Sequence, residues 1–156
     1  PEAFRRLPDG SFWIGDEFGP WLVHVDGRGA VLSPPIGIPG VRSPEHPEAG
    51  ARGATLRGSR GLEGLALAPD GRTLWPMLEG TVAGDPEGTV RIYEFDTRTR
   101  AFASDDATGE PRIRRYRLDA AEHAIGELTA LDARRFVVIE RDGRAGAEAR
   151  FKRVYR

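Results

Sequence analysis

The residues of this sequence that could do chemistry are acidic side chains at the ends of short β-rich segments. The chain contains three similar units: in the second and third, one acid precedes a hairpin turn and another follows the strand after that turn, and in the first, two acids follow that strand. Antiparallel pairing puts the start of the first strand beside the end of the second, so we expect these acids to gather at one rim of the fold. They are Asp16, Glu17, Glu63, Glu79, Glu127 and Glu140.

Such a gathering of carboxylates favours a metal site. Neighbouring acids repel one another unless a cation lies between them, and Ca²⁺ is a divalent cation that takes many carboxylate oxygens. We therefore predict Ca²⁺ as the cofactor, with these acids as its ligands. The strand pairing predicts that Glu127 meets Glu140, and Glu63 meets Glu79, at the same rim. The alternative for each acid is a solvated strand end or an ion pair with a nearby arginine.

Two arginines lie close to these acids in the chain. Arg60 comes shortly before Glu63, and Arg141 directly follows Glu140. A guanidinium can bind two phosphate oxygens at once, so we predict that Arg60 and Arg141 clamp the phosphate group of a substrate. Charge balance with the neighbouring acids is the alternative interpretation.

The elements that must hold these residues are β-strands. Short runs rich in β-branched and aromatic residues, such as residues 21–25 and 89–95, are bounded by Asp-Gly or glycine-rich turns. The turn aspartates Asp9, Asp70 and Asp132 follow one another at steps of 61 and 62 residues. Radial repetition of four-stranded sheets is the plan of a β-propeller. We predict an all-β fold: a partial β-propeller of about three antiparallel four-stranded blades.

The predicted blades are residues 1–40, 61–118 and 125–156, with a loop at 41–60 that is rich in Pro, Gly and Arg. A β-sandwich with unrelated Asp-Gly turns is the alternative, but two motifs that recur in step argue against it. Pro76 removes a backbone donor and predicts a bulge or an early exit in its strand. The sequence starts at Pro1 without an initiator Met or signal peptide, so we expect a fragment of one domain whose missing blades belong to its parent chain.

Composition limits the classes of partner and cofactor. Of the 156 residues 39% are hydrophobic and 30% are charged, and the net charge is −1, so neither nucleic acid nor membrane insertion is expected. The absence of cysteine excludes disulfides, thiolate zinc sites and thiol nucleophiles. The expected partner is a small-molecule phosphate ester.

Several motifs, in order and over nearly the whole chain, carry a resemblance to a known family. They are FWIGDEFGP at 12–20, RGLEGLAL at 60–67, PDGRTL at 69–74, RIYEFD at 91–96, IGEL at 125–128 and VIERD at 138–142. Together they resemble the bacterial family named for the esterase-like activity of phytase. The resemblance implies a β-propeller, export to the periplasm or beyond, and a calcium-dependent phosphoesterase activity. The sequence departs from the family pattern at Ser59, where an Asn commonly stands, and at Trp75-Pro76.

The predicted function is an exported phosphoric ester hydrolase, phytase-like and dependent on Ca²⁺ held by the rim carboxylates. Two alternatives stay open. One is a non-catalytic β-propeller binding module that uses the same rim to bind a protein, glycan or lipid. The other is a propeller lactonase with a single central divalent metal.

Overall fold

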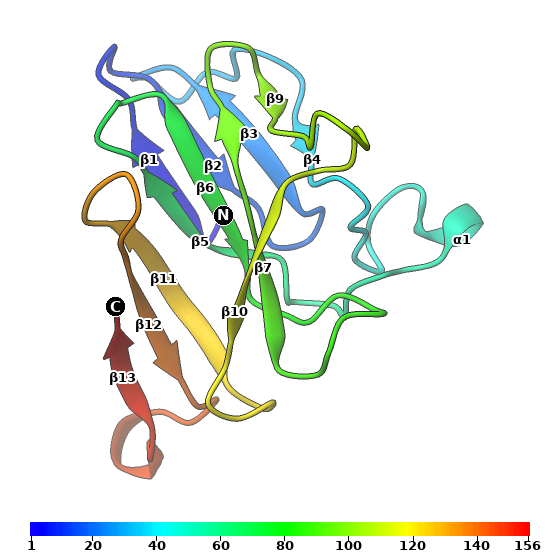
Figure 1. Cartoon of the computed structure of the whole chain (residues 1–156), viewed down its shortest axis with the longest axis vertical. Coiled ribbons are helices and arrows are strands. Elements are labelled where there is room, and N and C mark those ends of the chain that lie inside the picture. Colours follow the sequence, from blue (N-terminus) through cyan, green and yellow to red (C-terminus); the bar gives the residue numbers. More distant parts are fainter.

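β-Strands make up nearly all of the regular structure in the computed structural model, which describes residues 1–156 (Figure 1). The all-β prediction is confirmed. The helical segments are α1 (Ala49–Arg52) and the 3₁₀ turn η1 (Gly146–Glu148), and neither has the length or apolar character that a membrane crossing requires. The strands are β1 (Ala3–Arg6), β2 (Phe12–Gly15), β3 (Trp21–Val25), β4 (Ile36–Gly37), β5 (Leu62–Leu67), β6 (Thr73–Leu78), β7 (Thr89–Tyr93), β8 (Phe95–Asp96), β9 (Ala101–Phe102), β10 (Ile113–Arg117), β11 (Ala124–Ala130), β12 (Phe136–Arg141) and β13 (Lys152–Tyr155).

The strands form three antiparallel sheets in chain order, coloured blue to cyan, green to yellow and orange to red in Figure 1. The first sheet has the order β1-β2-β3-β4. The second has six strands: β5 pairs with one edge of β6, and the rest follow the order β10-β7-β6-β8-β9. The third has the order β11-β12-β13. The strand number therefore differs from the expected four in the second and third sheets, and the arrangement about a propeller axis stays a prediction.

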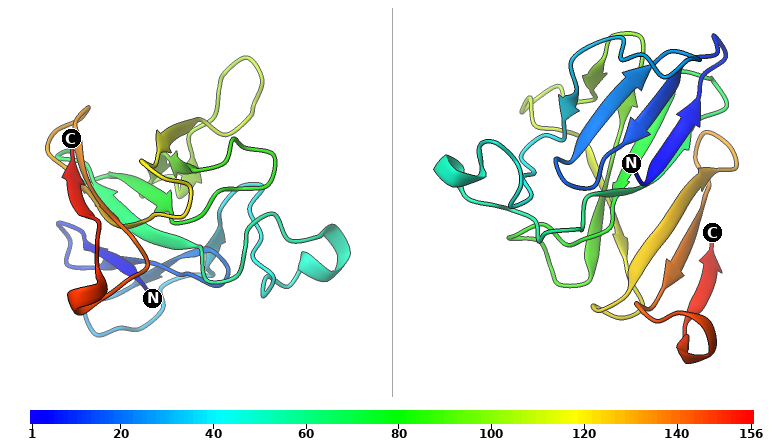
Figure 2. Two further views of the ribbon diagram at one scale, coloured as in Figure 1. Left: turned by 90° about the horizontal axis from the view of Figure 1, so that it is seen from below. Right: turned by 180° about the vertical axis from the view of Figure 1, so that it is seen from behind.

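The first strands of the three sheets lie side by side. β5 lies next to both β1 and β11, and Figure 2 shows the blue and the orange sheets on either side of the green one. Because each first strand pairs with the second strand of its own sheet, the ends of the second strands also approach one another. This arrangement positions the candidate site.

Two apolar cores hold the sheets together. One joins the first and second sheets and includes Trp13 and Leu74; the other joins the second and third and includes Met77 and Leu128. β6 contributes to both cores. A strand that is buried on both faces has a continuous apolar run instead of an alternating one, and residues 74–78 of β6 are apolar and buried throughout.

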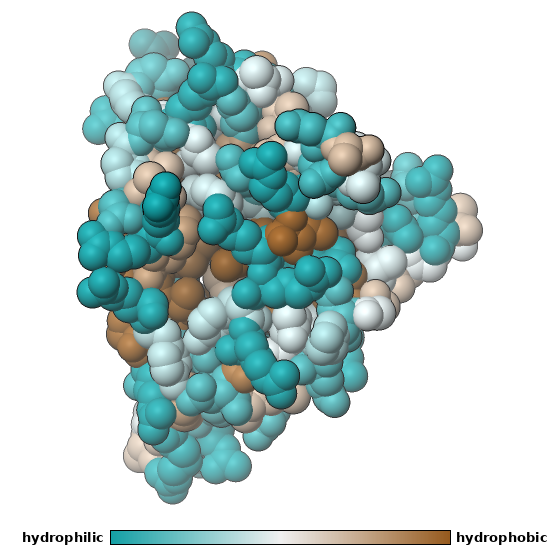
Figure 3. Space-filling model, in the orientation of Figure 1, coloured by the Kyte–Doolittle hydropathy of each residue, from teal (hydrophilic) through white to brown (hydrophobic).

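The middle sheet is also the one whose large apolar residues are covered. Hydrophilic residues occupy most of the face seen in Figure 3, with apolar residues in patches near its middle and along one side. Over the whole surface, the large apolar side chains that stay exposed come from the first and third sheets and their loops. They are Phe4, Phe18, Val31, Leu32, Leu131, Ile139 and Val154.

Pro76 lies inside β6 without ending it, so the predicted early exit of this strand is wrong. Pro76 pairs in regular register with Leu65 of β5. On the other edge of β6, β7 pairs only at Met77, and β8 pairs at Thr73 and Leu74. The missing N–H of Pro76 therefore lies at the interruption between β7 and β8, where β6 has no pairing partner on that edge. For this reason the proline leaves β6 continuous.

Candidate functional site

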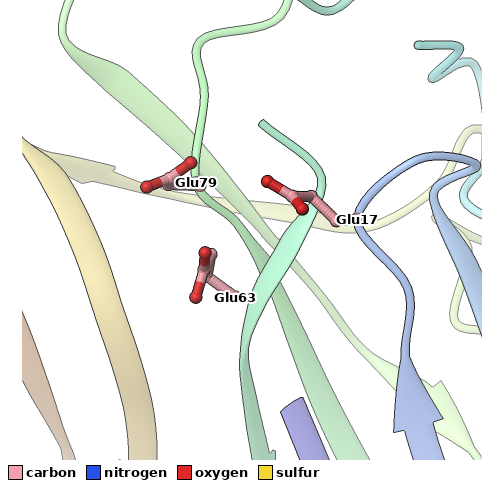
Figure 4. A group of neighbouring side chains, drawn as sticks. All are labelled: Glu17, Glu63 and Glu79. Carbon is pink, nitrogen blue, oxygen red and sulfur yellow. The ribbon is translucent and has the colours of Figure 1, made fainter. Parts of the chain in front are cut away.

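Three of the predicted acids meet where the first and second sheets come together. Glu17 follows β2, Glu63 lies in β5, and Glu79 follows β6. One carboxylate oxygen of each residue lies within 4.8 Å of those of the other two. Figure 4 shows the three side chains turned toward a common space. Glu17, Glu63 and Glu79 are called the carboxylate cluster below.

The strand register explains why residues so far apart in the chain converge. The second strands of the three sheets, β2, β6 and β12, can be aligned at their first paired residue after the hairpin. Five residues further along, the corresponding positions are Glu17, Glu79 and Arg141. The three sheets therefore bring one repeated position to the same place, and the third sheet contributes a guanidinium where the other two contribute carboxylates.

Glu63 reaches the cluster because it is the extra residue of a β-bulge. The pairing of β5 with β6 shifts between Leu62 and Gly64, and a bulge re-aims the side chain of the extra residue. The two glycines around Glu63 permit close packing. A Cβ on Gly61 would lie 2.0 Å from a backbone oxygen of the loop after β2, and one on Gly64 would lie 2.9 Å from Leu128 Cβ. In the Gly-Leu-Glu-Gly motif, each glycine thus allows a neighbouring segment to approach closely, and the acid lies between the two glycines.

Both predicted arginines lie at the cluster and bind Glu79. Arg60 Nη1 lies 3.4 Å from Glu79 Oε2, and Arg141 Nη2 donates to Glu79 Oε1 at 3.0 Å. The Glu79 side chain is 5% exposed, so these pairs balance a buried charge. Of the three acids, only Glu79 makes ion pairs. Glu63 itself makes no ion pair.

Burial and repulsion change the acidity of the cluster. Burial, followed by repulsion from Glu79, raises the pKa of Glu63 from 4.5 to about 7, although Arg141 opposes this rise. Burial also raises the pKa of Glu79, against the opposing charges of Arg60 and Arg141. Glu79 is paired with both arginines, whereas Glu17 and Glu63 make no ion pair, so no direct partner neutralises their negative charge. Three converging carboxylates whose negative charge is only partly balanced are suitable ligands for a hard divalent cation.

A cavity of about 360 Å³ opens over the cluster. Its walls contain all three acids together with Arg60 and Arg141. A larger cavity of about 600 Å³ adjoins it and shares Arg60 and Glu79 in its wall. The volume of each cavity falls in the range of small-molecule sites, roughly 300–1,000 Å³. The arrangement can hold a cation at the carboxylates and an anionic group at the guanidiniums.

A family model described as phytase-like, with esterase-like activity of phytase, matches residues 1–156. The chain belongs to the phytase-like family. The resemblance carried by its motifs is confirmed over the whole length.

A relative of this phytase-like chain is described as an uncharacterized secreted protein of Arthroderma benhamiae. The two are 25% identical over 185 aligned residues, which cover 95% of this chain and 35% of the relative. The chain thus spans about a third of that protein's length. No solved structure matches the phytase-like chain.

Glu127 lies outside the cluster, and the expected meeting of Glu127 with Glu140 is wrong. In β11 the extra residue of the bulge is Gly126, which therefore corresponds to Glu63. The sequence prediction matched Glu127 with Glu63 because both are acids, but Glu127 lies one residue beyond the corresponding position. A shift of one residue turns a side chain to the opposite face of the strand. A Cβ on Gly126 would lie 3.8 Å from Arg141 Nε, so the arginine side chain passes over this position.

The Glu127 carboxylate instead ties the first strands of the three sheets together. Its Oε2 lies 2.9 Å from Arg5 Nη2 of β1. Its Oε1 accepts hydrogen bonds from the backbone N–H groups of Leu65 in β5, at 3.3 Å, and Leu128 in β11, at 2.7 Å. Arg5 also donates to the Leu128 carbonyl oxygen at 3.0 Å. The role visible for Glu127 is structural.

Glu140 is fully buried and also lies outside the cluster. Its pairing with Ile125 directs the side chain toward the second sheet. There it accepts hydrogen bonds from Tyr116 Oη at 2.7 Å and from the Asp119 backbone N–H at 2.8 Å, and it contacts His123 Nδ1 at 2.7 Å. These three partners already occupy the carboxylate.

The loop residues beside the cluster hold Glu17 in place. Asp16 Oδ2 accepts the backbone N–H of Gly19 at 2.7 Å, so Asp16 shapes the loop after β2 and does not join the cluster. Ser59 adopts a φ of 55°, in the left-handed region where Asn is enriched among residues other than glycine. Its hydroxyl donates to Glu17 Oε1. Ser in place of the Asn of the family pattern thus keeps a polar group next to Glu17.

Proposed function

We propose that this protein hydrolyses phosphate esters with the help of a Ca²⁺ ion bound by Glu17, Glu63 and Glu79. The observation that carries the proposal is a cavity whose wall combines three converging carboxylates with two arginines. The family supports it, because its description names a phytase and an esterase-like activity.

The donor set fits a divalent cation. Glu63 makes no ion pair, and repulsion from Glu79 and Glu17 adds to the effect of burial in raising its pKa. A divalent cation would relieve this repulsion, so its binding would stabilise the charged form of Glu63 more than that of the other two acids. When bound, the cation supplies positive charge for the phosphoryl oxygens and makes a water molecule more acidic.

In this proposal the two arginines bind the phosphate group of the substrate. Arg60 and Arg141 each bind one oxygen of Glu79, and both side chains are about a third exposed, at 39% and 34%. Guanidinium groups that are partly exposed beside the cavity can turn to the oxygens of an incoming phosphate group. Glu79 then becomes available as a ligand, so that substrate and cation favour each other's binding.

We further propose that the protein acts outside the cytoplasm. The relative from Arthroderma benhamiae is described as secreted, and the family resemblance implies export. A small-molecule phosphate ester is the proposed substrate class.

The test is release of phosphate from p-nitrophenyl phosphate and from inositol hexakisphosphate, in Ca²⁺ and after chelation. We expect activity that chelation removes and Ca²⁺ restores, and loss of at least about 100-fold in Glu63→Gln. Glu110→Gln, which removes one negative charge from an exposed loop, is the matched control and should keep full activity. Ca²⁺ binding without hydrolysis would point to the binding module, and hydrolysis of lactones alone would point to the lactonase.

A further inference from the structure

Glu140 and His123 form a largely buried polar pair outside the carboxylate cluster. Glu140 in β12 is fully buried. His123, in the loop between β10 and β11, has an imidazole that is 11% exposed and lies 2.7 Å from Glu140 through Nδ1. The ring of Phe151 packs on the imidazole with centroids 4.1 Å apart. The position and tilt of this imidazole are therefore fixed by two contacts.

The surroundings of Glu140 determine which imidazole nitrogen carries the proton. The Tyr116 hydroxyl donates to Glu140, and burial followed by this hydrogen bond raises the pKa of Tyr116 above its ordinary value, so the hydroxyl stays a donor. The Asp119 backbone N–H is a second donor. Glu140 is thus held as an acceptor, and Nδ1 of His123 supplies the third hydrogen. Nε2 is left without a protein partner.

The imidazole borders the same space as the proposed substrate site. His123 lines the cavity of about 600 Å³, together with Arg60 and Glu79. Arg60 and Glu79 also line the smaller cavity over the carboxylate cluster. A substrate whose phosphate lies at the arginines would extend its alcohol part into the larger cavity, where His123 stands. A carboxylate that orients an imidazole and stabilises its protonated form is a recurrent device for proton transfer.

We infer that His123 is the general acid that protonates the leaving alcohol, and that Glu140 is the positioning residue that holds it; this inference rests on the proposed function. A water oxygen forms the new bond to phosphorus and releases a proton to solvent. The bond between phosphorus and the ester oxygen breaks, and its electron pair stays on that oxygen. The ester oxygen takes the proton that the imidazolium form of His123 carries on Nε2, which leaves a neutral imidazole with its proton on Nδ1, and solvent then returns a proton to Nε2. The products are the alcohol and inorganic phosphate.

The test uses leaving groups of different basicity, since a general acid matters for poor leaving groups and little for good ones. The substrates are ethyl phosphate, a poor leaving group, and p-nitrophenyl phosphate, a good one. His123→Asn keeps an amide N–H near the place of Nδ1 and removes Nε2. We expect kcat on ethyl phosphate to fall by about 100-fold or more, and kcat on p-nitrophenyl phosphate by less than about fivefold. His46→Asn, the same substitution at a histidine that lines neither cavity, is the matched control and should change neither rate.

Three other outcomes are informative. An equal loss on both substrates in His123→Asn overturns the inference and leaves the proposed function standing. If the variant does not fold, the wild type alone decides: its rates on ethyl phosphate and p-nitrophenyl phosphate should differ by less than about 100-fold, and a steeper dependence overturns the inference. If the wild type hydrolyses neither ester in Ca²⁺, the proposed function fails, and this inference fails with it.

Discussion

Replacing Glu63 by Gln should stabilise the protein at alkaline pH and leave its stability at acidic pH nearly unchanged. In the folded protein the pKa of Glu63 is raised from 4.5 to about 7, and in the unfolded chain it returns to the ordinary value. Below pH 4.5 the carboxyl is protonated in both states and carries no penalty. As the pH rises to 7 and beyond, the unfolded state loses its proton first, so the free energy of unfolding falls.

The size of the effect follows from the displacement of the pKa. One unit corresponds to about 1.4 kcal/mol, so the full displacement would cost the folded state roughly 3 kcal/mol. Glu63 is half-buried, and solvent screening reduces this cost to roughly 1–2 kcal/mol. We therefore expect the free energy of unfolding of Glu63→Gln to exceed that of the wild type by about 1–2 kcal/mol at pH 8.5, and by less than about 0.5 kcal/mol at pH 4.

The assay is urea unfolding followed by tryptophan fluorescence, in buffers free of divalent cations, with equal m-values as the condition for comparing midpoints. Glu110→Gln, on an exposed loop, controls for the loss of one negative charge. A difference between wild type and Glu63→Gln that is the same at both pH values would refute the reasoning. So would a wild type that is the more stable protein at pH 8.5.

Three further predictions concern residues around the cluster. Glu127→Gln should lower the free energy of unfolding by about 1–2 kcal/mol, because it weakens the bonds that join the sheets, and should change Ca²⁺ affinity by less than about twofold in calorimetry; a large loss of affinity would return Glu127 to the metal site. Gly64→Ala should cost about 1–3 kcal/mol in urea unfolding, since its Cβ would lie 2.9 Å from Leu128 Cβ; a neutral result would mean that β5 and β11 pack less closely. Arg141→Ala should raise KM for p-nitrophenyl phosphate by about tenfold or more, whereas the exposed Arg144→Ala should not; equal KM values would remove Arg141 from phosphate binding.

Part of the candidate site could be predicted from the sequence, because antiparallel pairing determines which strand ends meet. The acid at the start of β5 and the acid at the end of β6 must lie together once the hairpin between them is recognised. The repeat adds Glu17, because β2 and β6 place their corresponding residues at the same site. Arg60 and Arg141 could be predicted from their proximity to acids in the chain, and both lie at Glu79.

The third sheet shows where sequence reasoning failed and why. A bulge changes the register by one residue, and no residue type marks it; Gly126 therefore replaces the carboxylate expected from Glu127. Residue type also gives no sign that Glu140 is buried, because burial of an acid depends on partners from elsewhere in the chain. His123 was missed for the same reason: its role depends on a contact with Glu140 across 17 positions of the chain.

Calorimetric titration with Ca²⁺ tests the central claim most directly, because it measures both binding and proton release. Binding of a cation to Glu63 requires the deprotonated carboxylate, and the pKa of Glu63 is about 7. Titrations at pH 6 in two buffers with different ionisation enthalpies should therefore show release of about one proton per Ca²⁺, falling nearly to zero at pH 8.5. Glu63→Gln should bind Ca²⁺ more weakly and release fewer protons than the wild type at pH 6. No Ca²⁺ binding by the wild type, or the same proton release from Glu63→Gln, would contradict the assignment of the carboxylate cluster as the metal site.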